Sequence, residues 1–286
     1  VVSAADGDID VTATAGNISQ TLGQVLATDG GVRMRAGGNI DVINIAANAN
    51  NMTGGLNAIK LDADGNIGIT GTGLNAEDAG ENLNISIDPV DVTIGAAVTA
   101  TGNVTVVADN NITVNAGITV TADSDNDNTG NANLTADNDS SSAGDFVSTG
   151  ATIRGENVTI GGYNVEAGVL TADFDGVGDG DVTVNAQNNA TLNSAVTGGD
   201  LVGGTIDINA LAGNAVTAAG GTLDAGGAIT VDAGLDITLG ATVDSELANV
   251  ALTSGNDTDI NFTVTAETGV TVNADKPGAA GDIDPT

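Results

Sequence analysis

The chain has 286 residues and carries 38 acidic against 5 basic side chains, a formal net charge of −33. Its residues are 41% hydrophobic but only 1% aromatic, and it contains neither Cys nor His. This composition excludes a basic surface for nucleic acid or anionic lipid, and it excludes disulfides and histidine-based catalysis. No apolar run reaches the ~20 residues of a transmembrane helix, so we expect no membrane insertion.

The apolar content is Ala, Val, Ile and Leu, which suits an interior only a few side chains wide. The 42 Gly come with only 3 Pro, and the mean hydropathy is +0.13. Disordered chains have low hydrophobicity, so this chain is expected to fold. Helix is disfavoured throughout, because Gly, Asn, Thr and Val are poor helix formers.

The strands predicted in chain order share one pattern, an alternation of apolar and polar residues that buries one face. They are 40–45, 104–107, 112–115, 158–160, 182–185, 206–209 and 229–232. In the last third of the chain the distance between equivalent strand positions becomes regular, at about 20–24 residues, which lies in the range of solenoid repeats. These positions are Val182, Ile206, Ile229, Val250 and Val270.

This pattern predicts a single β-solenoid over residues 1–274, with about a dozen windings if each holds 20–24 residues. It is less regular over 1–101 and more regular over 155–274, with a polar loop insertion at about 122–144. Residues 275–286 are expected to form an extended tail.

The residues expected at the turns between strands favour a solenoid over an antiparallel sandwich. The sandwich remains the alternative, because the chain also contains Asp-Gly, a dipeptide of tight hairpins. Tight hairpins favour Asn-Gly, and the chain has no such dipeptide. Instead Asn precedes Ile or Val directly, as at Asn17, Asn39, Asn66, Asn111 and Asn157. Asn tolerates left-handed backbone angles, so it can turn a corner into a strand, and stacked corners let its side chains hydrogen-bond from winding to winding.

Three phrases of the sequence resemble the repeats of filamentous haemagglutinin-type adhesins of two-partner secretion: 110–116, 133–139 and 226–233. The resemblance covers most of the chain from about Gly102 onward. It implies an all-β, right-handed parallel β-helix, export to a bacterial cell surface, and a role in adhesion, biofilm or filament formation. The secretion domain that begins such proteins is not recognisable here, which leaves the export route open.

The insertion holds a candidate Ca²⁺ site at Asp123, Asp125 and Asp127, whose alternate spacing is similar to the start of a calcium loop. It is not an EF-hand, because Asn128 and Leu134 stand where Gly and Glu are required. The alternative interpretation is a solvated acidic loop. A weaker calcium candidate is Asp175, Asp179 and Asp181, whose motif does not recur.

A carbohydrate-active β-helix enzyme is a minor alternative, since paired carboxylates can hydrolyse glycosides and Asp207 and Asp232 fall on successive windings. The lack of His, basic residues and aromatic platforms argues against it, so we expect a protein without catalytic activity. We predict no resident cofactor beyond the candidate Ca²⁺.

We therefore predict an extracellular structural or adhesive rod, a segment of a bacterial surface adhesin that displays loops to a host or matrix glycan or protein ligand. The alternative is a filament subunit that stacks on copies of itself. Both interpretations expect end-to-end continuation, because a solenoid winding exposes strand edges above and below it and no cap is recognisable near Ile9–Thr12.

Overall fold

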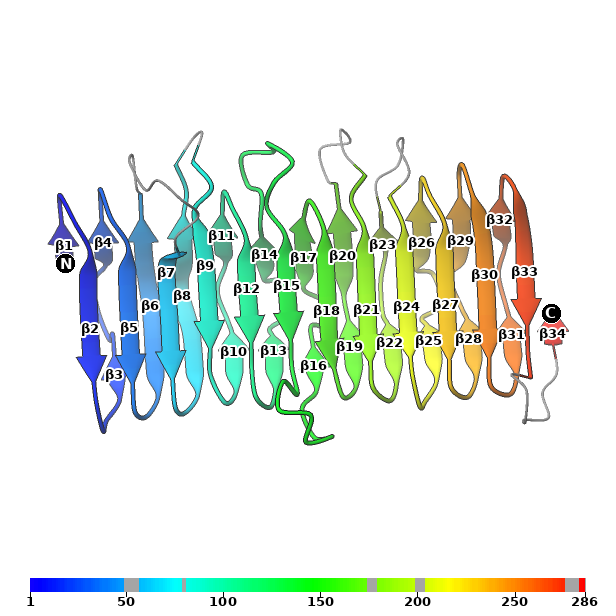
Figure 1. Ribbon diagram of the computed structural model, residues 1–286, viewed down its shortest axis with the longest axis horizontal. Helices are drawn as coiled ribbons and strands as arrows, with labels where there is room; N and C mark the ends of the chain where they lie inside the picture. Colours follow the sequence, from blue (N-terminus) through cyan, green and yellow to red (C-terminus); the bar gives the residue numbers. More distant parts are fainter. Residues whose placement is uncertain (49–56, 79–80, 174–178, 199–203, 276–282, 286) are drawn as a thin grey trace.

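The computed structural model describes residues 1–48, 57–78, 81–173, 179–198, 204–275 and 283–285. These residues contain strands and no helix. In Figure 1 the near strands run downward and the far strands upward while the chain advances from left to right, so the winding is right-handed. The described chain is a β-solenoid, as predicted.

The front sheet, nearest the viewer in Figure 1, has 12 strands and receives one strand from each winding. Its strands are β2 (Ile9–Ala13), β5 (Val32–Ala36), β7 (Asn57–Ala63), β9 (Asn84–Asp88), β12 (Val104–Val107), β15 (Ala132–Thr135), β18 (Val158–Gly162), β21 (Val182–Ala186), β24 (Ile206–Ala210), β27 (Ile229–Ala233), β30 (Asn249–Ser254) and β33 (Gly269–Asn273).

The back sheet has 22 strands, because most windings cross it in two short strands and only β6 (Ile40–Ala47) and β8 (Ile67–Ala76) cross it in one. The lower row in Figure 1 also holds β3 (Ile18–Ser19), β10 (Val92–Ile94), β13 (Ile112–Val114), β16 (Phe146–Val147), β19 (Val165–Ala167), β22 (Ala190–Leu192), β25 (Ala215–Thr217), β28 (Ile237–Leu239), β31 (Thr258–Ile260) and β34 (Ile283–Pro285). The upper row also holds β1 (Val2–Ala4), β4 (Val25–Ala27), β11 (Val98–Ala100), β14 (Thr119–Thr121), β17 (Thr152–Gly155), β20 (Val169–Ala172), β23 (Val196–Thr197), β26 (Thr222–Ala225), β29 (Thr242–Ser245) and β32 (Val264–Ala266).

The strand pairings of the described residues are parallel and join each strand to its counterpart one winding away. The antiparallel sandwich is therefore excluded for this part of the chain. Winding length varies while the register is kept, apart from two irregularities, where β6 pairs with β8 and where β7 pairs with β9. Ile85 pairs with Val104, 19 residues on, and Val104 pairs with Ala132, 28 residues on. Extra residues leave the sheets as loops at the corners, which is why the sequence period looks irregular before residue 155.

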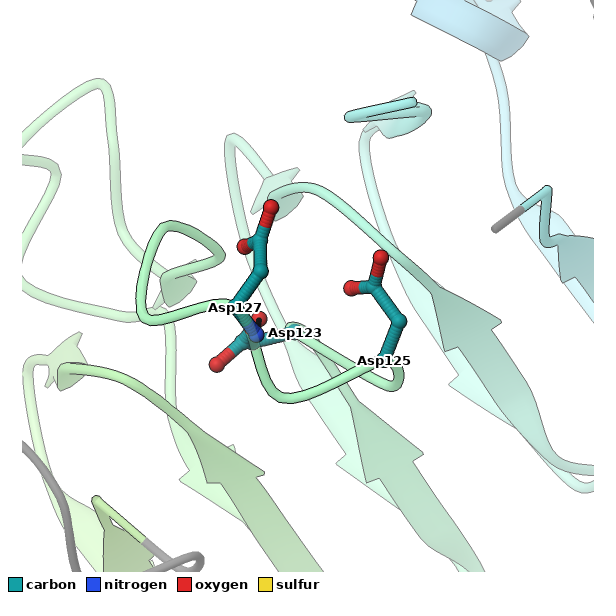
Figure 2. A group of neighbouring side chains, drawn as sticks. All are labelled: Asp123, Asp125 and Asp127. Carbon is teal, nitrogen blue, oxygen red and sulfur yellow. Dashed lines mark hydrogen bonds between the residues drawn. The ribbon is translucent and has the colours of Figure 1, made fainter. Parts of the chain in front are cut away.

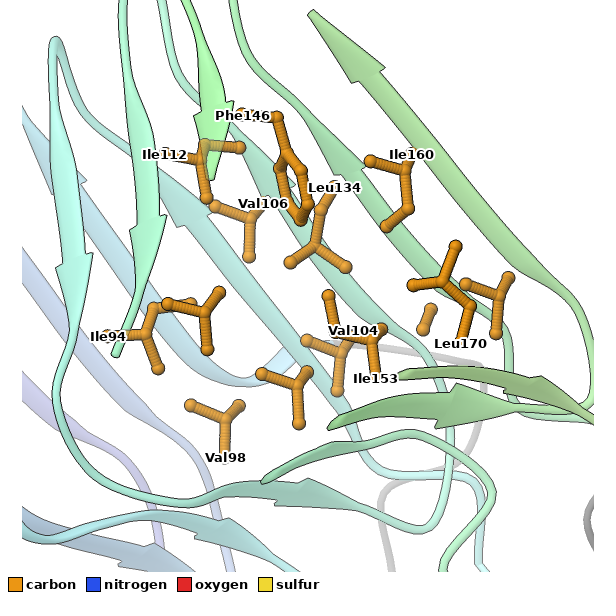
Figure 3. Packing of buried hydrophobic residues seen from close by; sticks show 14 of the residues in the cluster. Ile94, Val98, Val104, Val106, Ile112, Leu134, Phe146, Ile153, Ile160 and Leu170 are labelled. Carbon is orange, nitrogen blue, oxygen red and sulfur yellow. The ribbon is translucent and has the colours of Figure 1, made fainter. Parts of the chain in front are cut away.

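The interior is a thin column of stacked aliphatic side chains (Figure 3). In the front sheet Val182, Ile206 and Ile229 stack in register, and all three are fully buried. Their polar neighbours in each strand point to solvent, so the two-residue alternation of the sequence maps directly onto the two faces of the sheet. Phe146, also fully buried, lies between Ile112 and Val165.

Asn and Asp side chains form a hydrogen-bonded ladder at the corner that leads into the lower row of the back sheet. Each side-chain Oδ1 accepts a hydrogen bond from the backbone N–H of the equivalent residue one winding on. The links form two series at 2.9–3.3 Å. The first joins Asn17, Asn39 and Asn66, and the second joins Asp91, Asn111, Asp145, Asn164, Asn189, Asn214, Asp236 and Asp257. The predicted stacking of corner Asn residues is confirmed.

A second ladder precedes the front sheet and joins Asn84, Asn103, Asn131, Asn157, Asp181 and Thr205, at 2.7–3.1 Å. Glycine makes room for the ladders. A Cβ on Gly38 or on Gly213 would stand 2.3 or 2.4 Å from the Oδ1 of the Asn one winding earlier. The recurrent Gly-Asn dipeptide before a strand is thus a steric requirement of the stacked corner.

The insertion expected over residues 122–144 is two loops with a strand between them. β15 pairs with β12 and β18, and Ala132 and Leu134 are buried in the interior. The surrounding polar residues obscured this short alternation. The first loop, 122–131, projects beyond the upper row, and the second, 136–145, projects beyond the lower row (Figure 1).

Of the tail, residues 276–282 and 286 lie outside the described residues, whereas β34 pairs in parallel with β31. No helix of the described chain has the length and apolar character needed to cross a membrane.

Candidate functional site

The first loop brings the three predicted calcium ligands together (Figure 2). One carboxylate oxygen from each of Asp123, Asp125 and Asp127 lies within 4.8 Å of the other two. Asp123 is almost fully buried at the loop base, and its two oxygens accept hydrogen bonds from the backbone N–H groups of Asp127 and Asn128, at 3.0 and 3.2 Å. The carboxylate of Asp123 thus organises the loop, while that of Asp127 is exposed.

Burial raises the pKa of Asp123, and the neighbouring Asp127 carboxylate adds to the rise while the backbone N–H groups oppose it. A cation held by the three carboxylates would relieve this desolvation and repulsion. Oxygen ligands of this kind suit Ca²⁺, which takes six to eight of them, so the loop could supply part of a coordination shell. Ca²⁺ binding here stays a prediction.

The second loop is organised by Asp137, which is 2% exposed. Its carboxylate accepts hydrogen bonds from the Ser141 hydroxyl, from the backbone N–H of Ser142 and from the Gln187 amide, at 3.0, 3.3 and 2.8 Å. The loop is thereby fixed to Gln187, the residue that follows β21 (Val182–Ala186), two windings away from its own strand β15.

Next to this loop the outer face of the front sheet is hollowed by a groove of about 280 Å³. Its floor is Gly161 in β18, which pairs with Thr135 on one side and Asn185 on the other. The walls carry hydroxyl and amide groups, and among the described residues that line the groove Asp137 is the one with a charge. Sequence reasoning missed this groove. The outward Gly161, where neighbouring windings carry Thr135 and Asn185, was the available signal, but it is readable only once the register is known.

Three of the five basic residues meet on the front sheet near the first windings. Arg33 pairs with Lys60 across β5 and β7, and Arg35 pairs with Asp62. The Asp8 carboxylate accepts a hydrogen bond from Arg33 at 2.5 Å, which lowers the pKa of Asp8 and raises that of Arg33. Asp10 and Asp62 add longer ion pairs to Arg33 and Arg35. The patch is internally neutralised, so it offers little net positive charge to an anion.

The other candidates do not assemble into a site. Asp207 pairs with Thr230 and Asp232 with Asn209, so the two carboxylates occupy different outer columns and are offset by two residues. Asp175 lies outside the described residues. Asp181 belongs to the second ladder, where its Oδ1 accepts hydrogen bonds from both the backbone N–H and the hydroxyl of Thr205.

The fold and its loops define a β-solenoid repeat protein. No protein-family model, no curated protein and no solved structure matches this chain.

Proposed function

We propose that the chain is a rod-like segment of an extracellular bacterial surface adhesin of the filamentous haemagglutinin type, which stiffens the molecule and displays loops along its length. The observation that carries this proposal is the unbroken hydrogen bonding between windings, from β2 to β33 in the front sheet. Each winding is fixed to the next by its strands, and Asn or Asp side chains at the corners add links between most windings. A structure built this way resists bending and local opening.

The distribution of loops supports the same function. The two organised loops project from opposite edges of the solenoid, where they do not disturb the sheets (Figure 1). The outer surface is strongly acidic, and a net charge of −33 keeps such rods apart and soluble. We propose the loops and the nearby groove as the regions that meet a host or matrix ligand.

A second candidate, a subunit that polymerises end to end, is favoured by the two terminal windings. Val1 and Leu22 are each 88% exposed at the first winding, and Phe262 and Val270 are 48% and 45% exposed at the last. The column of interior side chains extends to both ends of the solenoid. At the last winding, for example, Val272 is only partly buried. A further winding would cover these side chains, and either more of the same chain or a second copy could supply it.

Negative-stain electron microscopy of the purified chain separates these functions. Twelve front-sheet strands spaced by about 4.8 Å predict a rod of roughly 53 Å. Separate rods at all concentrations support the adhesin segment, whereas fibres of uniform width that lengthen with concentration support the filament. A compact globule would contradict both. Turnover of an acidic polysaccharide by the same preparation would instead support the enzyme alternative.

A further inference from the structure

The groove over Gly161 is open because a side chain is missing there. The outward column to which Gly161 belongs holds Thr135 one winding before it, then Asn185 and Asn209 in the windings after it. The Nδ2 of Asn209 donates a hydrogen bond to the Oδ1 of Asn185 at 3.1 Å. Gly161 therefore interrupts a stretch of the column that carries polar side chains from Thr135 to Asn209.

Nothing in the backbone requires glycine at this position. The φ of Gly161 lies outside the left-handed region. A Cβ placed on it would meet Thr135 and Asn185 atoms at 3.5–3.8 Å, which is ordinary van der Waals contact. Gly162 is different, because a Cβ there would stand 3.0 Å from the carbonyl oxygen of Asn164. Packing thus explains Gly162, whereas what Gly161 provides is space on the outer face.

The walls of the groove determine what can occupy that space. The polar side chains that line it are uncharged, apart from Asp137, whose carboxylate is already held by Ser141, Ser142 and Gln187. The uncharged ones are Thr135, Asn138, Ser140, Thr159, Asn185 and Gln187. These hydroxyl and carboxamide groups both donate and accept hydrogen bonds, as the hydroxyl groups of a sugar do.

Other ligand classes fit less well. An acidic ligand would approach a protein of net charge −33 that places no free cation in the groove. A peptide could not add as a strand, because β18 is paired on both sides and has no open edge. The volume of about 280 Å³ lies just below the range of roughly 300–1,000 Å³ of small-molecule sites, which suits a short stretch of a longer chain.

We infer that the groove over Gly161 is a binding site for a neutral saccharide, recognised by hydroxyl and amide side chains of the front sheet and by the loop that Asp137 organises. The inference rests on the proposed surface function and gives it a ligand class. Asp137 acts as a positioning residue, since it holds the loop that carries Asn138 and Ser140.

The test is saturation-transfer NMR on the purified chain with three neutral trisaccharides, maltotriose, mannotriose and N,N′,N″-triacetylchitotriose, and with trigalacturonate as the acidic comparator. We expect transfer to at least one neutral trisaccharide and none to trigalacturonate. In Gly161→Asn the new side chain extends the Asn185–Asn209 column and fills the groove, so binding should weaken at least about tenfold.

The matched control is Ala251→Asn, which places the same side chain on the outer face of β30, far from the groove, and should leave binding unchanged. Circular dichroism melts show whether each variant folds. The inference is overturned if no neutral trisaccharide binds, if trigalacturonate binds equally well, or if Gly161→Asn binds like the wild type. Since electron microscopy decides the rod independently, a rod without sugar binding contradicts only the groove.

Discussion

Asn157 and Asp181 lie one winding apart, and the side-chain Oδ1 of Asn157 accepts a hydrogen bond of 2.9 Å from the backbone N–H of Asp181. Asn157 itself donates to Asn131 through both its backbone N–H and its side-chain amide. One side chain thus serves the windings before and after it, and the corner that leads into the front sheet is hydrogen-bonded from winding to winding between Asn84 and Thr205.

Asn157→Ala should lower the free energy of unfolding by about 1–3 kcal/mol, because it removes two hydrogen bonds of the ladder, each worth roughly 0.5–1.5 kcal/mol. The matched control is Asn209→Ala, which removes an outward amide and should change stability by no more than about 0.5 kcal/mol. Urea unfolding followed by circular dichroism measures both. Equal effects of the two substitutions would show that the corner ladder has no special role.

Phe146→Ala should cost about 3–5 kcal/mol, because it leaves a cavity in a column that has no room to collapse. Phe146→Ile restores the kind of residue found at Ile112 in the preceding winding, and should cost less than about 1.5 kcal/mol. Thermal melts of both variants check this order. A tolerated alanine would mean that the windings on either side close over the gap.

Replacing a corner glycine with alanine should change the melting temperature by very different amounts at different corners. A Cβ at Gly255 would stand 1.9 Å from the carbonyl oxygen of Gly234, so Gly255→Ala must displace one winding against the next and should melt at a lower temperature. At Gly16 nothing lies within 4 Å of the added Cβ, so Gly16→Ala should be neutral or stabilising by up to about 1 kcal/mol. Melting temperatures in the reverse order would contradict the close approach of the Gly234 and Gly255 corners.

Two front-sheet carboxylates should affect stability with opposite dependence on pH. The hydrogen bond from Arg33 holds the pKa of Asp8 below its ordinary 3.8, so this pair stabilises the fold above that pH and is lost as pH falls through the folded pKa. Burial, followed by repulsion from Asp62 and Asp109, raises the pKa of Asp88, so its ionisation costs stability as pH rises from 3.8 through the folded pKa.

Accordingly, Asp8→Asn should melt below the wild type at pH 7 and Asp88→Asn above it, and both differences should shrink towards acid pH. The shifts should be small, because both side chains are exposed. Melts from about pH 3 to 7 measure them, a range that spans the ordinary pKa of an aspartate. A difference of the same sign for both variants would contradict the assigned causes.

Calcium should raise the melting temperature of the wild type if the acidic loop binds it, because a ligand that binds only the folded state stabilises that state. Asp125→Asn removes one of the three converging carboxylates and should reduce the shift, whereas Asp207→Asn, on the flat sheet, should not. Melts in chelator, Mg²⁺ and Ca²⁺ make the comparison. Identical shifts for both variants would indicate diffuse screening of the acidic surface.

Much of this fold is predictable from the alternation of residues and the corner Asn residues, because both report directly on local geometry. The segment 132–135 resembles a loop in the sequence because polar residues surround its short alternation, and only the pairing of Leu134 with Val106 and Ile160 identifies it as strand. The features that the sequence does not predict depend on the register between windings. Whether Asp207 meets Asp232, or Gly161 opens a groove, depends on which residues align across windings, and variable winding length conceals this.

Beyond the two register shifts near the first windings, windings that differ in length keep one register, and this has a consequence for engineering and for evolution. Between Val104 and Ala132 the chain already accommodates nine more residues than between Ile85 and Val104, with the same stacking of neighbours. The loop tip around Asn126 should therefore be a permissive insertion point, where a foreign epitope is carried without refolding its host. Lineages that share this architecture can then diversify their exposed edges quickly while the tube itself is conserved.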